Sequence, residues 1–251
     1  MTKDDYDRYR YFLKDSVRQE VDFRRTDQSM GVPPPPAQKP YGTDAALVDL
    51  PDGVSALRNR CRMQVGEAIL QRESRRSFAP DSLLLEELSA LLYAVQGVRR
   101  KIREGIALRT VPSAGARHSF ETYIAVDRVE GLEAGLYRYL PFDGKLLQLY
   151  TDQEIAVKAA RACLGQGFVA SAAATFFWTS IPARMEWRYG KASHKVIAVD
   201  AGHVGQNLYL ACEALGAGTC AIAAYDQEAC DRLLGVDGQE EFTVYISPVG
   251  K

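Results

Sequence analysis

Two strand patterns joined by a short turn limit the fold more than any other feature of this 251-residue sequence. GLYRYL (135–140) and KLLQLY (145–150) are rich in residues that favour strands, and the turn segment PFDG lies between them. A connection this short joins antiparallel neighbours, because parallel strands need a crossover of about a dozen residues or more. The hairpin therefore excludes a sheet built only from repeated βαβ units.

Helix and strand patterns alternate along the rest of the chain. One helix is predicted where leucines recur at helical spacing between residues 84 and 95, with Asp81 or Ser82 as its N-cap and Gly97 at its end. Further helices are predicted at 4–20, 63–71, 152–163, 200–216 and 226–235, and further strands at 121–126, 172–180, 218–225 and 241–250. Residues 98–112 read as a basic loop. This order predicts an α+β or mixed α/β layered fold.

The sequence divides into two parts at about residue 45. Residues 1–45 are predicted to form an N-terminal helix and a proline-rich arm, and residues 46–251 a single larger domain. The segment MGVPPPPAQKPYG (30–42) must be extended, because consecutive prolines block helix and favour polyproline II. It is either a linker or an arm that lies across another surface.

Composition excludes several classes of function. The formal net charge of −1 gives no overall positive field for nucleic acid or acidic membranes. Five cysteines without CxxC spacing argue against a disulfide framework or zinc site, and are predicted to be small buried side chains. The three histidines form no metal pattern, and His203 is expected to be structural. Without an apolar signal or membrane-spanning run, a cytoplasmic protein is expected.

One basic cluster stands out in RESRRSF (72–78). Arg72, Ser74 and Arg76 alternate, so an extended backbone brings their side chains to one side. Two guanidinium groups and a hydroxyl suit a phosphate, because arginine binds oxyanions through two parallel hydrogen bonds. The alternative is a solvated basic turn.

Two segments of small residues could lie against a flat ring. PSAGA (112–116) lets a ligand approach the backbone, and Ser113 can hydrogen-bond a ring edge, although most such segments are simple turns. GAGTCAIAA (216–224) lacks the GxGxxG order of a dinucleotide-binding turn. The sequence also lacks the HExxH and GxSxG motifs, and no paired carboxylates suggest a glycosidase.

In their order along the chain, these segments resemble one family. RESRRSF, RTVPSAGARHSFETYIAV, GLYRY, DAGHVGQNLYLACEALGAGTCAI and the final PVGK look like the SagB-type, thiazole/oxazole oxidase-like dehydrogenases of the nitroreductase superfamily. The likeness runs from about residue 30 to the end. It implies an α+β fold with a mixed, largely antiparallel sheet flanked by helices. It also implies FMN as cofactor and a homodimer with flavin at the subunit interface.

The resemblance assigns roles to individual residues. Arg72, Ser74 and Arg76 would hold the FMN phosphate, with Lys251 in support, although other nitroreductases continue into a longer C-terminal arm. Gln166 would contact the pyrimidine edge of the ring, and the backbone amides of Ala223 and Ala224 would face flavin N5 or O4. Four residues of the partner subunit would lie against the ring: Pro112, Ser113, Ala114 and Ala116.

The catalytic pair departs from the azoline-oxidising relatives. They resemble one another in carrying a Lys-Tyr pair before the DAGHVGQN-like helix, whereas this sequence has Arg188 and Tyr189. Arginine essentially cannot act as a base, but Tyr189 can still exchange a proton. The pair is either catalytic or an ordinary helix end. Three functions stay open: azoline oxidation on a modified peptide, NAD(P)H-driven reduction of small nitro or quinone acceptors, and a non-catalytic subunit of a modifying complex.

Overall fold

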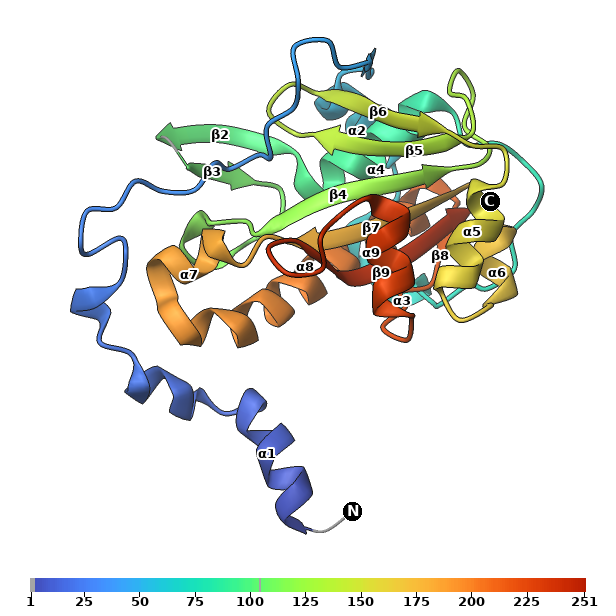
Figure 1. Cartoon of the computed structure of the whole chain (residues 1–251). Helices are drawn as coiled ribbons and strands as arrows, with labels where there is room; N and C mark the ends of the chain where they lie inside the picture. Colours follow the sequence, from blue (N-terminus) through green and yellow to red (C-terminus); the bar gives the residue numbers. More distant parts are fainter. Residues whose placement is uncertain (1–2, 104) are drawn as a thin grey trace.

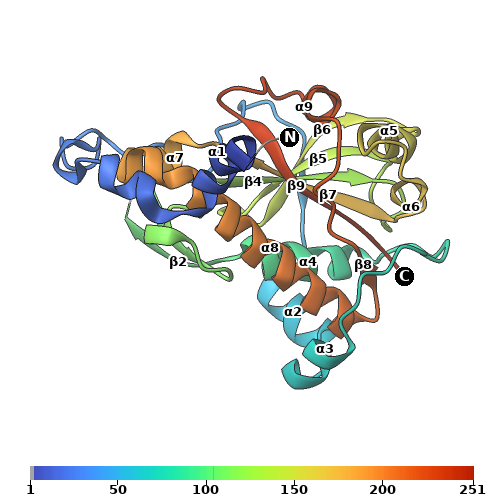
Figure 2. The ribbon, with the colours of Figure 1, turned by 90° about the horizontal axis from the view of Figure 1, so that it is seen from below.

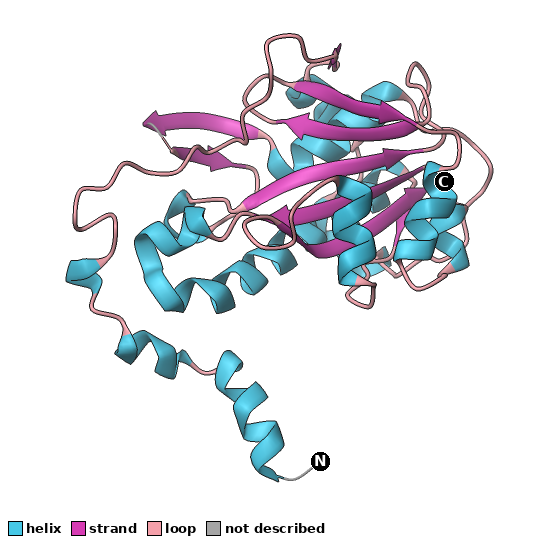
Figure 3. Cartoon of the chain, viewed as in Figure 1, coloured by secondary structure: helices cyan, strands magenta, loops and turns pink. Residues whose placement is uncertain are grey.

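A computed structural model describes residues 3–103 and 105–251. One large sheet forms its centre, and Figures 1 and 3 show helices on both sides of that sheet. The α-helices are α1 (Lys3–Leu13), α2 (Gly53–Arg60), α3 (Val65–Gln71), α4 (Leu85–Gln96), α5 (Ile155–Ala162), α6 (Gly167–Ala170), α7 (Ala183–Tyr189), α8 (Ser193–Leu215) and α9 (Gln227–Leu234). None of the described helices is both long and apolar enough to cross a lipid bilayer.

The central sheet has the strand order β1-β6-β5-β4-β7-β9-β8, and all of its strand pairs are antiparallel. Its strands are β1 (Leu47–Asp49), β4 (Phe120–Val126), β5 (Gly135–Leu140), β6 (Lys145–Thr151), β7 (Ala174–Ser180), β8 (Gly218–Thr219) and β9 (Phe242–Gly250). The predicted hairpin is confirmed as β5–β6, in which Leu140 pairs with Lys145. The α+β class with a largely antiparallel sheet is likewise confirmed.

Each face of the sheet carries its own hydrophobic core. Along β4, Ile124 and Val126 belong to a core with α4 and α8, whereas Tyr123 and Ala125 belong to a core with α5 and α9. This alternation follows from the two-residue period of a strand. Figure 2 shows α2, α3, α4 and α8 on one side of the sheet and α5, α6 and α9 on the other. Both faces are therefore buried, and functional side chains must lie at the ends and edges of these layers.

A second, two-stranded sheet corrects the loop that was predicted at 98–112. β2 (Val98–Arg103) pairs antiparallel with β3 (Ile106–Arg109), and the hairpin projects from the body in Figure 1. Five of the six residues of β2 are exposed, so the apolar alternation of a half-buried strand is missing.

Four other predicted boundaries were wrong. α4 begins after Leu84, whose backbone N–H donates to the Glu87 carboxylate (2.9 Å), so neither Asp81 nor Ser82 is its N-cap. α8 begins at Ser193 instead of residue 200, and the strand predicted at 218–225 ends at Thr219. The helix predicted at 4–20 ends at Leu13 and is followed by a 3-10 turn. Four of the five cysteines are buried as predicted, whereas Cys61 is half-buried.

The proline-rich segment lies along the body of its own chain, as the arm alternative predicts. Trp187 Nε1 donates to the Val32 carbonyl (2.7 Å), and Arg109 Nη2 donates to the Ala37 carbonyl (2.8 Å). In Figure 1 the segment passes the β2–β3 hairpin on its way to β1. The division into two domains at residue 45 stays a prediction.

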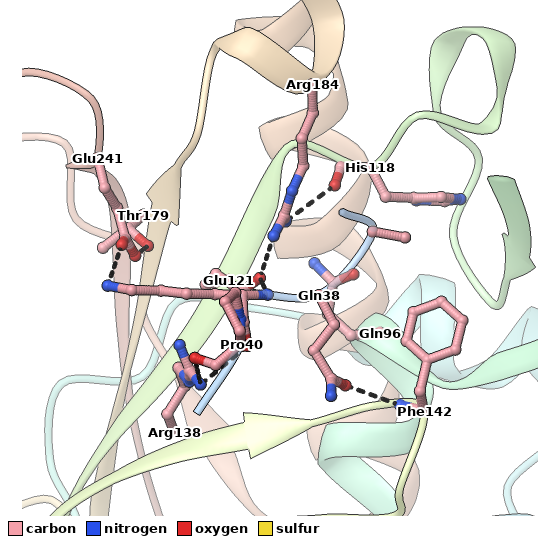
Figure 4. A network of polar contacts seen from close by, with 12 residues as sticks. Gln38, Pro40, Gln96, His118, Glu121, Arg138, Phe142, Thr179, Arg184 and Glu241 are labelled. Carbon is pink, nitrogen blue, oxygen red and sulfur yellow. Dashed lines mark hydrogen bonds and ion pairs between the residues drawn. The ribbon is translucent and has the colours of Figure 1, made fainter. Parts of the chain in front are cut away.

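A buried polar network holds the end of this arm (Figure 4). Glu121 accepts hydrogen bonds from Arg184 Nη2 (2.5 Å) and from the backbone N–H of Lys39 (2.8 Å). The side chains of Glu121 and Arg184 are each only 2% exposed. The Lys39 ammonium pairs with Glu241, which also accepts from the Thr179 hydroxyl (2.7 Å). The arm thus packs on the folded body, because its backbone and Lys39 make polar contacts with two buried carboxylates.

Candidate functional site

The segment after α3 lies against β8 and α8. The Arg75 backbone N–H donates to the Thr219 carbonyl (3.0 Å), and the Arg75 guanidinium pairs with Glu213 of α8. Arg72 and Ser74 also contact α8, through Tyr209. The phosphate role of the basic cluster Arg72, Ser74 and Arg76 stays a prediction.

Tyr209 of α8 connects this cluster to the backbone that follows β8. The Arg72 guanidinium lies 5.2 Å from the centre of the Tyr209 ring, and Ser74 Oγ is 2.9 Å from the Tyr209 hydroxyl. The same hydroxyl accepts from the backbone N–H of Ala221 (2.9 Å). Sequence reasoning missed Tyr209. The sequence feature that could have identified Tyr209 is its spacing of four residues from Glu213, which puts both side chains on the same face of α8.

Gln166 and Ala224, predicted separately to contact the flavin ring, lie together. Gln166 Nε2 donates to the carbonyls of Cys163 and Ala224, both at 2.9 Å. Ala223 and Ala224 are exposed, and their backbone N–H groups donate to no acceptor in the part of the chain that the structure describes. Two backbone donors are therefore available to a ligand beside Gln166.

Lys251 has a defined partner. Its ammonium lies 3.0 Å from the Glu87 carboxylate at the start of α4, and its backbone carbonyl accepts from the Ala79 N–H. The residue therefore fastens the end of β9 to the segment that carries the basic cluster.

The PSAGA segment packs against the predicted catalytic pair. Gly115 has a φ of +59°, and a Cβ there would lie 2.7 Å from the Tyr189 hydroxyl and 2.9 Å from Arg188 Nε. Only glycine allows this approach. The Arg188 guanidinium in turn lies 5.4 Å from the centre of the Tyr189 ring. The structure thus brings Gly115 into contact with Arg188 and Tyr189, which lie more than 70 residues later in the sequence.

A cavity of about 260 Å³ opens beside this segment. Its lining includes Pro112, Ser113 and Ala116, three of the residues assigned to the flavin ring. Ser113 also supports the local turn, because its Oγ accepts from the backbone N–H of His118 (3.0 Å). Beneath the segment, burial raises the pKa of Asp200, an effect partly offset by Ser113 and His203. His203 Nδ1 lies 3.9 Å from the Asp200 carboxylate, and the structural role expected for His203 stays a prediction.

Positive charge is concentrated around the same cavity. Burial, reinforced by Arg109 and Arg184, lowers the pKa of His118 to about 3, so its imidazole is neutral at ordinary pH. Burial, with Arg184, Arg188 and Arg103 nearby, lowers the pKa of Arg117 to about 10. An anionic group would therefore be attracted to this end of the molecule.

The two clusters face opposite ways across α8. Asp200 contacts the PSAGA segment, whereas Tyr209 contacts Arg72 and Ser74. Nine residues separate the two on the helix, which is about two and a half turns, or roughly 13 Å of rise. The half turn puts them on opposite faces. Within one chain, the basic cluster and the PSAGA segment therefore do not face a common space.

Comparison with known proteins gives one family. The model of the nitroreductase family matches residues 69–251. The protein MJ1384 of Methanocaldococcus jannaschii, named as a nitroreductase, is 31% identical over 189 residues, which cover 75% of this chain and 91% of that protein. A solved structure described as a nitroreductase from Anabaena variabilis has a TM-score of 0.68 and 26% identity. The match covers 85% of this chain and 43% of the Anabaena chain.

A second curated relative has a different description. The trifolitoxin-processing protein TfxB of Rhizobium leguminosarum bv. trifolii is 32% identical over 112 residues. That match covers 43% of this chain and 30% of TfxB.

Proposed function

The chain belongs to the nitroreductase family and is an oxidoreductase, and we propose that it is an FMN-dependent dehydrogenase of the SagB type. When bound, FMN would supply a ring that accepts or donates hydride at N5. The observation that carries the proposal is the convergence of Arg72 and Ser74 on Tyr209, next to a backbone segment with unpaired donors.

The residues of the site suit FMN. Arg72, Ser74 and Arg76 would hold the phosphate through charge-assisted hydrogen bonds. The free N–H groups of Ala223 and Ala224 would donate to the ring edge, with Gln166 fixing the carbonyl of Ala224. Such donors stabilise the negative charge that a flavin gains on reduction.

A homodimer would join the two clusters. Since they lie on opposite faces of α8 in one chain, the PSAGA segment of one subunit would meet the basic cluster of the other. The exposed side of α8 carries mostly small residues and one exposed apolar side chain, and so suits close contact; it contains Ala198, Val199, Gly202 and Gln206. In this arrangement each flavin is held by both subunits.

On the substrate side, Arg188 and Tyr189 would act from beside Gly115. Oxidation of an azoline removes a hydride from one ring carbon and a proton from its neighbour. Tyr189 could receive or relay that proton, and the Arg188 guanidinium lies 5.4 Å from the centre of its ring. Arginine itself keeps its proton.

Two substrate classes are consistent with this chemistry. The likeness to TfxB, named for processing trifolitoxin, favours a modified peptide. The likeness to MJ1384, named as a nitroreductase, favours NAD(P)H-driven reduction of a small acceptor. Stopped-flow mixing of the FMN-loaded protein with NADPH separates them. Rapid bleaching of the flavin absorbance would identify the reductase, whereas an azoline peptide that bleaches flavin without NADPH would identify the dehydrogenase.

Arg72→Ala should weaken FMN binding by about 10- to 150-fold, which corresponds to roughly 1.5–3 kcal/mol for one charge-assisted contact. Quenching of flavin fluorescence on titration measures the dissociation constant. Arg62→Ala is the matched control, because the Arg62 side chain is exposed and bonds only the nearby Asn59 carbonyl among the described residues. Equal affinity for the Arg72 and Arg62 variants would remove the phosphate assignment.

Tyr189→Phe should leave FMN affinity unchanged and slow substrate oxidation about 100-fold or more, the usual contribution of a positioned proton-transfer group. Single-turnover flavin reduction by the substrate measures this step. Tyr150→Phe is the control. It also loses a tyrosine hydroxyl, in this case one that donates to the Leu233 carbonyl, and it should react at the wild-type rate. A Tyr189→Phe rate equal to that of Tyr150→Phe would reduce Tyr189 to a packing role.

A further inference from the structure

The β2–β3 hairpin leaves one strand edge unpaired. β2 pairs with β3 and, in the part of the chain that the structure describes, with no other strand. Its residues are exposed from Arg99 to Arg103, and Figure 3 shows the hairpin standing apart from the central sheet. An edge of this kind presents backbone N–H and C=O groups that can pair with another extended chain.

The hairpin is strongly basic. The sequence of β2 is VRRKIR, which holds four cations and no acid; Glu104, next in sequence, is outside the described residues. Two cations are anchored: Arg99 Nε donates to the Arg109 carbonyl (3.0 Å), and Lys101 Nζ lies 5.0 Å from the centre of the Phe142 ring. Arg100 and Arg103 have no acidic partner among the described residues. Both side chains are exposed.

The base of the hairpin reaches the candidate site. Arg99 lines the cavity of about 260 Å³ together with Pro112, Ser113 and Ala116. At the other end of β2, Arg103 lines a cavity of about 390 Å³ with Trp187, next to Arg188 in sequence. The proline-rich arm packs against the hairpin at Gly105, because a Cβ on that residue would lie 2.7 Å from Pro34. An extended chain placed along β2 would run between these two cavities.

We propose that β2 binds an acidic, extended segment of a peptide substrate as a third strand and so directs that peptide to the PSAGA cavity. This inference rests on the proposed function, in the form in which the substrate is a peptide. Backbone pairing would supply affinity for any extended chain, and the cations of β2 would select one with acidic side chains.

A peptide suits this surface better than a nucleic acid does. A strand edge alternates backbone donors and acceptors at the spacing of another polypeptide, whereas a phosphate backbone has only acceptors to offer. The molecule as a whole has a formal charge of −1, so no overall positive field would attract a nucleic acid. The competing explanation is that the cations merely protect an edge strand from aggregation.

The test uses the full chain loaded with FMN and a fluorescein-labelled decapeptide of alternating glutamate and valine. Fluorescence anisotropy measures binding. The doubly substituted R100E/R103E protein should bind at least about tenfold more weakly than the wild type, because two attractive contacts become repulsive. R161E/R232E is the matched control, since it reverses two exposed arginines on α5 and α9 and should bind like the wild type.

Other probes separate the alternatives. A peptide of the same charge with alternate backbone amides N-methylated should bind several-fold more weakly; equal binding would exclude strand addition. Equal affinity of R100E/R103E and R161E/R232E would overturn the proposal, and so would a single-stranded oligonucleotide that outcompetes the peptide. If the glutamate variant does not fold, R100Q/R103Q gives the same comparison with a smaller expected loss. A separate FMN titration of the wild type measures flavin binding by itself, so failure of flavin binding is not confused with failure of peptide binding.

Discussion

Glu121→Ala should lower the free energy of unfolding by about 3–5 kcal/mol, the usual cost of removing one partner of a buried ion pair. Arg184 would keep its charge in a site where its side chain is only 2% exposed, and the backbone N–H of Lys39 would also lose its acceptor. Urea denaturation followed by circular dichroism measures the effect. The loss should also loosen the proline-rich arm, which would become more sensitive to proteolysis near residues 37–40.

A surface pair provides the control for Glu121→Ala. Glu228 lies 3.4 Å from Arg232 on α9, with side chains 87% and 70% exposed, so Glu228→Ala should cost no more than about 0.5 kcal/mol. Glu121→Gln keeps an acceptor oxygen but removes the charge. Its loss in free energy of unfolding should lie between those of Glu121→Ala and Glu228→Ala. If Glu121→Ala and Glu228→Ala differed by less than about 1 kcal/mol, the network in Figure 4 would contribute little to stability.

The second large effect is a loss of stability in mild acid that depends on His118. The pKa of this buried imidazole is lowered to about 3, against about 6.5 in an unfolded chain. Between these values the unfolded chain binds a proton that the folded chain does not bind. Stability from this residue is therefore complete above about pH 6.5 and falls by about 1.4 kcal/mol per pH unit below it, or roughly 3 kcal/mol by pH 4.

His118→Asn tests this linkage. Residue 118 has a φ of +47°, a conformation that asparagine adopts more readily than most residues. The free energies of unfolding of wild type and variant should differ by a constant amount above pH 7, which reports packing alone. Below pH 6.5 the free energy of unfolding should fall less in the variant than in the wild type with each step of acidification. Parallel pH curves for the two proteins would show that His118 is protonated as easily in the folded state as in the unfolded one.

Local patterns predicted most of the central fold. The hairpin of β5 and β6 has strand residues on both sides of a turn, and the leucines of α4 keep one period from end to end, so neither depends on distant contacts. The β2–β3 hairpin could not be found in this way, because VRRKIR has no apolar face against which to count alternation. The strand after Gly216 was predicted too long, since its continuous pairing with β9 ends at Thr219 and is followed by an isolated bridge between Ile222 and Ile246.

The residues of the candidate site were likewise predicted where their signal is local and missed where it depends on tertiary contacts. Arg72, Ser74 and the PSAGA segment were named from sequence because their chemistry is local and their family pattern is distinctive. Tyr209 was missed because its role exists only once α8 lies beside residues 72–80. The approach of Gly115 to Arg188 and Tyr189 likewise comes from tertiary packing, and the flavin, the dimer and the catalytic roles stay predictions.

The position of β9 has a consequence for how the protein is made. This strand, residues 242–250, lies between β7 and β8 and follows the other strands of the sheet in sequence, so it leaves the ribosome after them. Until it emerges, β7 has an open edge, β8 has no neighbour in the sheet, and Lys39 lacks the carboxylate of Glu241. Pairings between residues so far apart in sequence form slowly. A nascent chain stalled before residue 241 would therefore expose an apolar strand edge, and would be expected to need a chaperone until synthesis resumes.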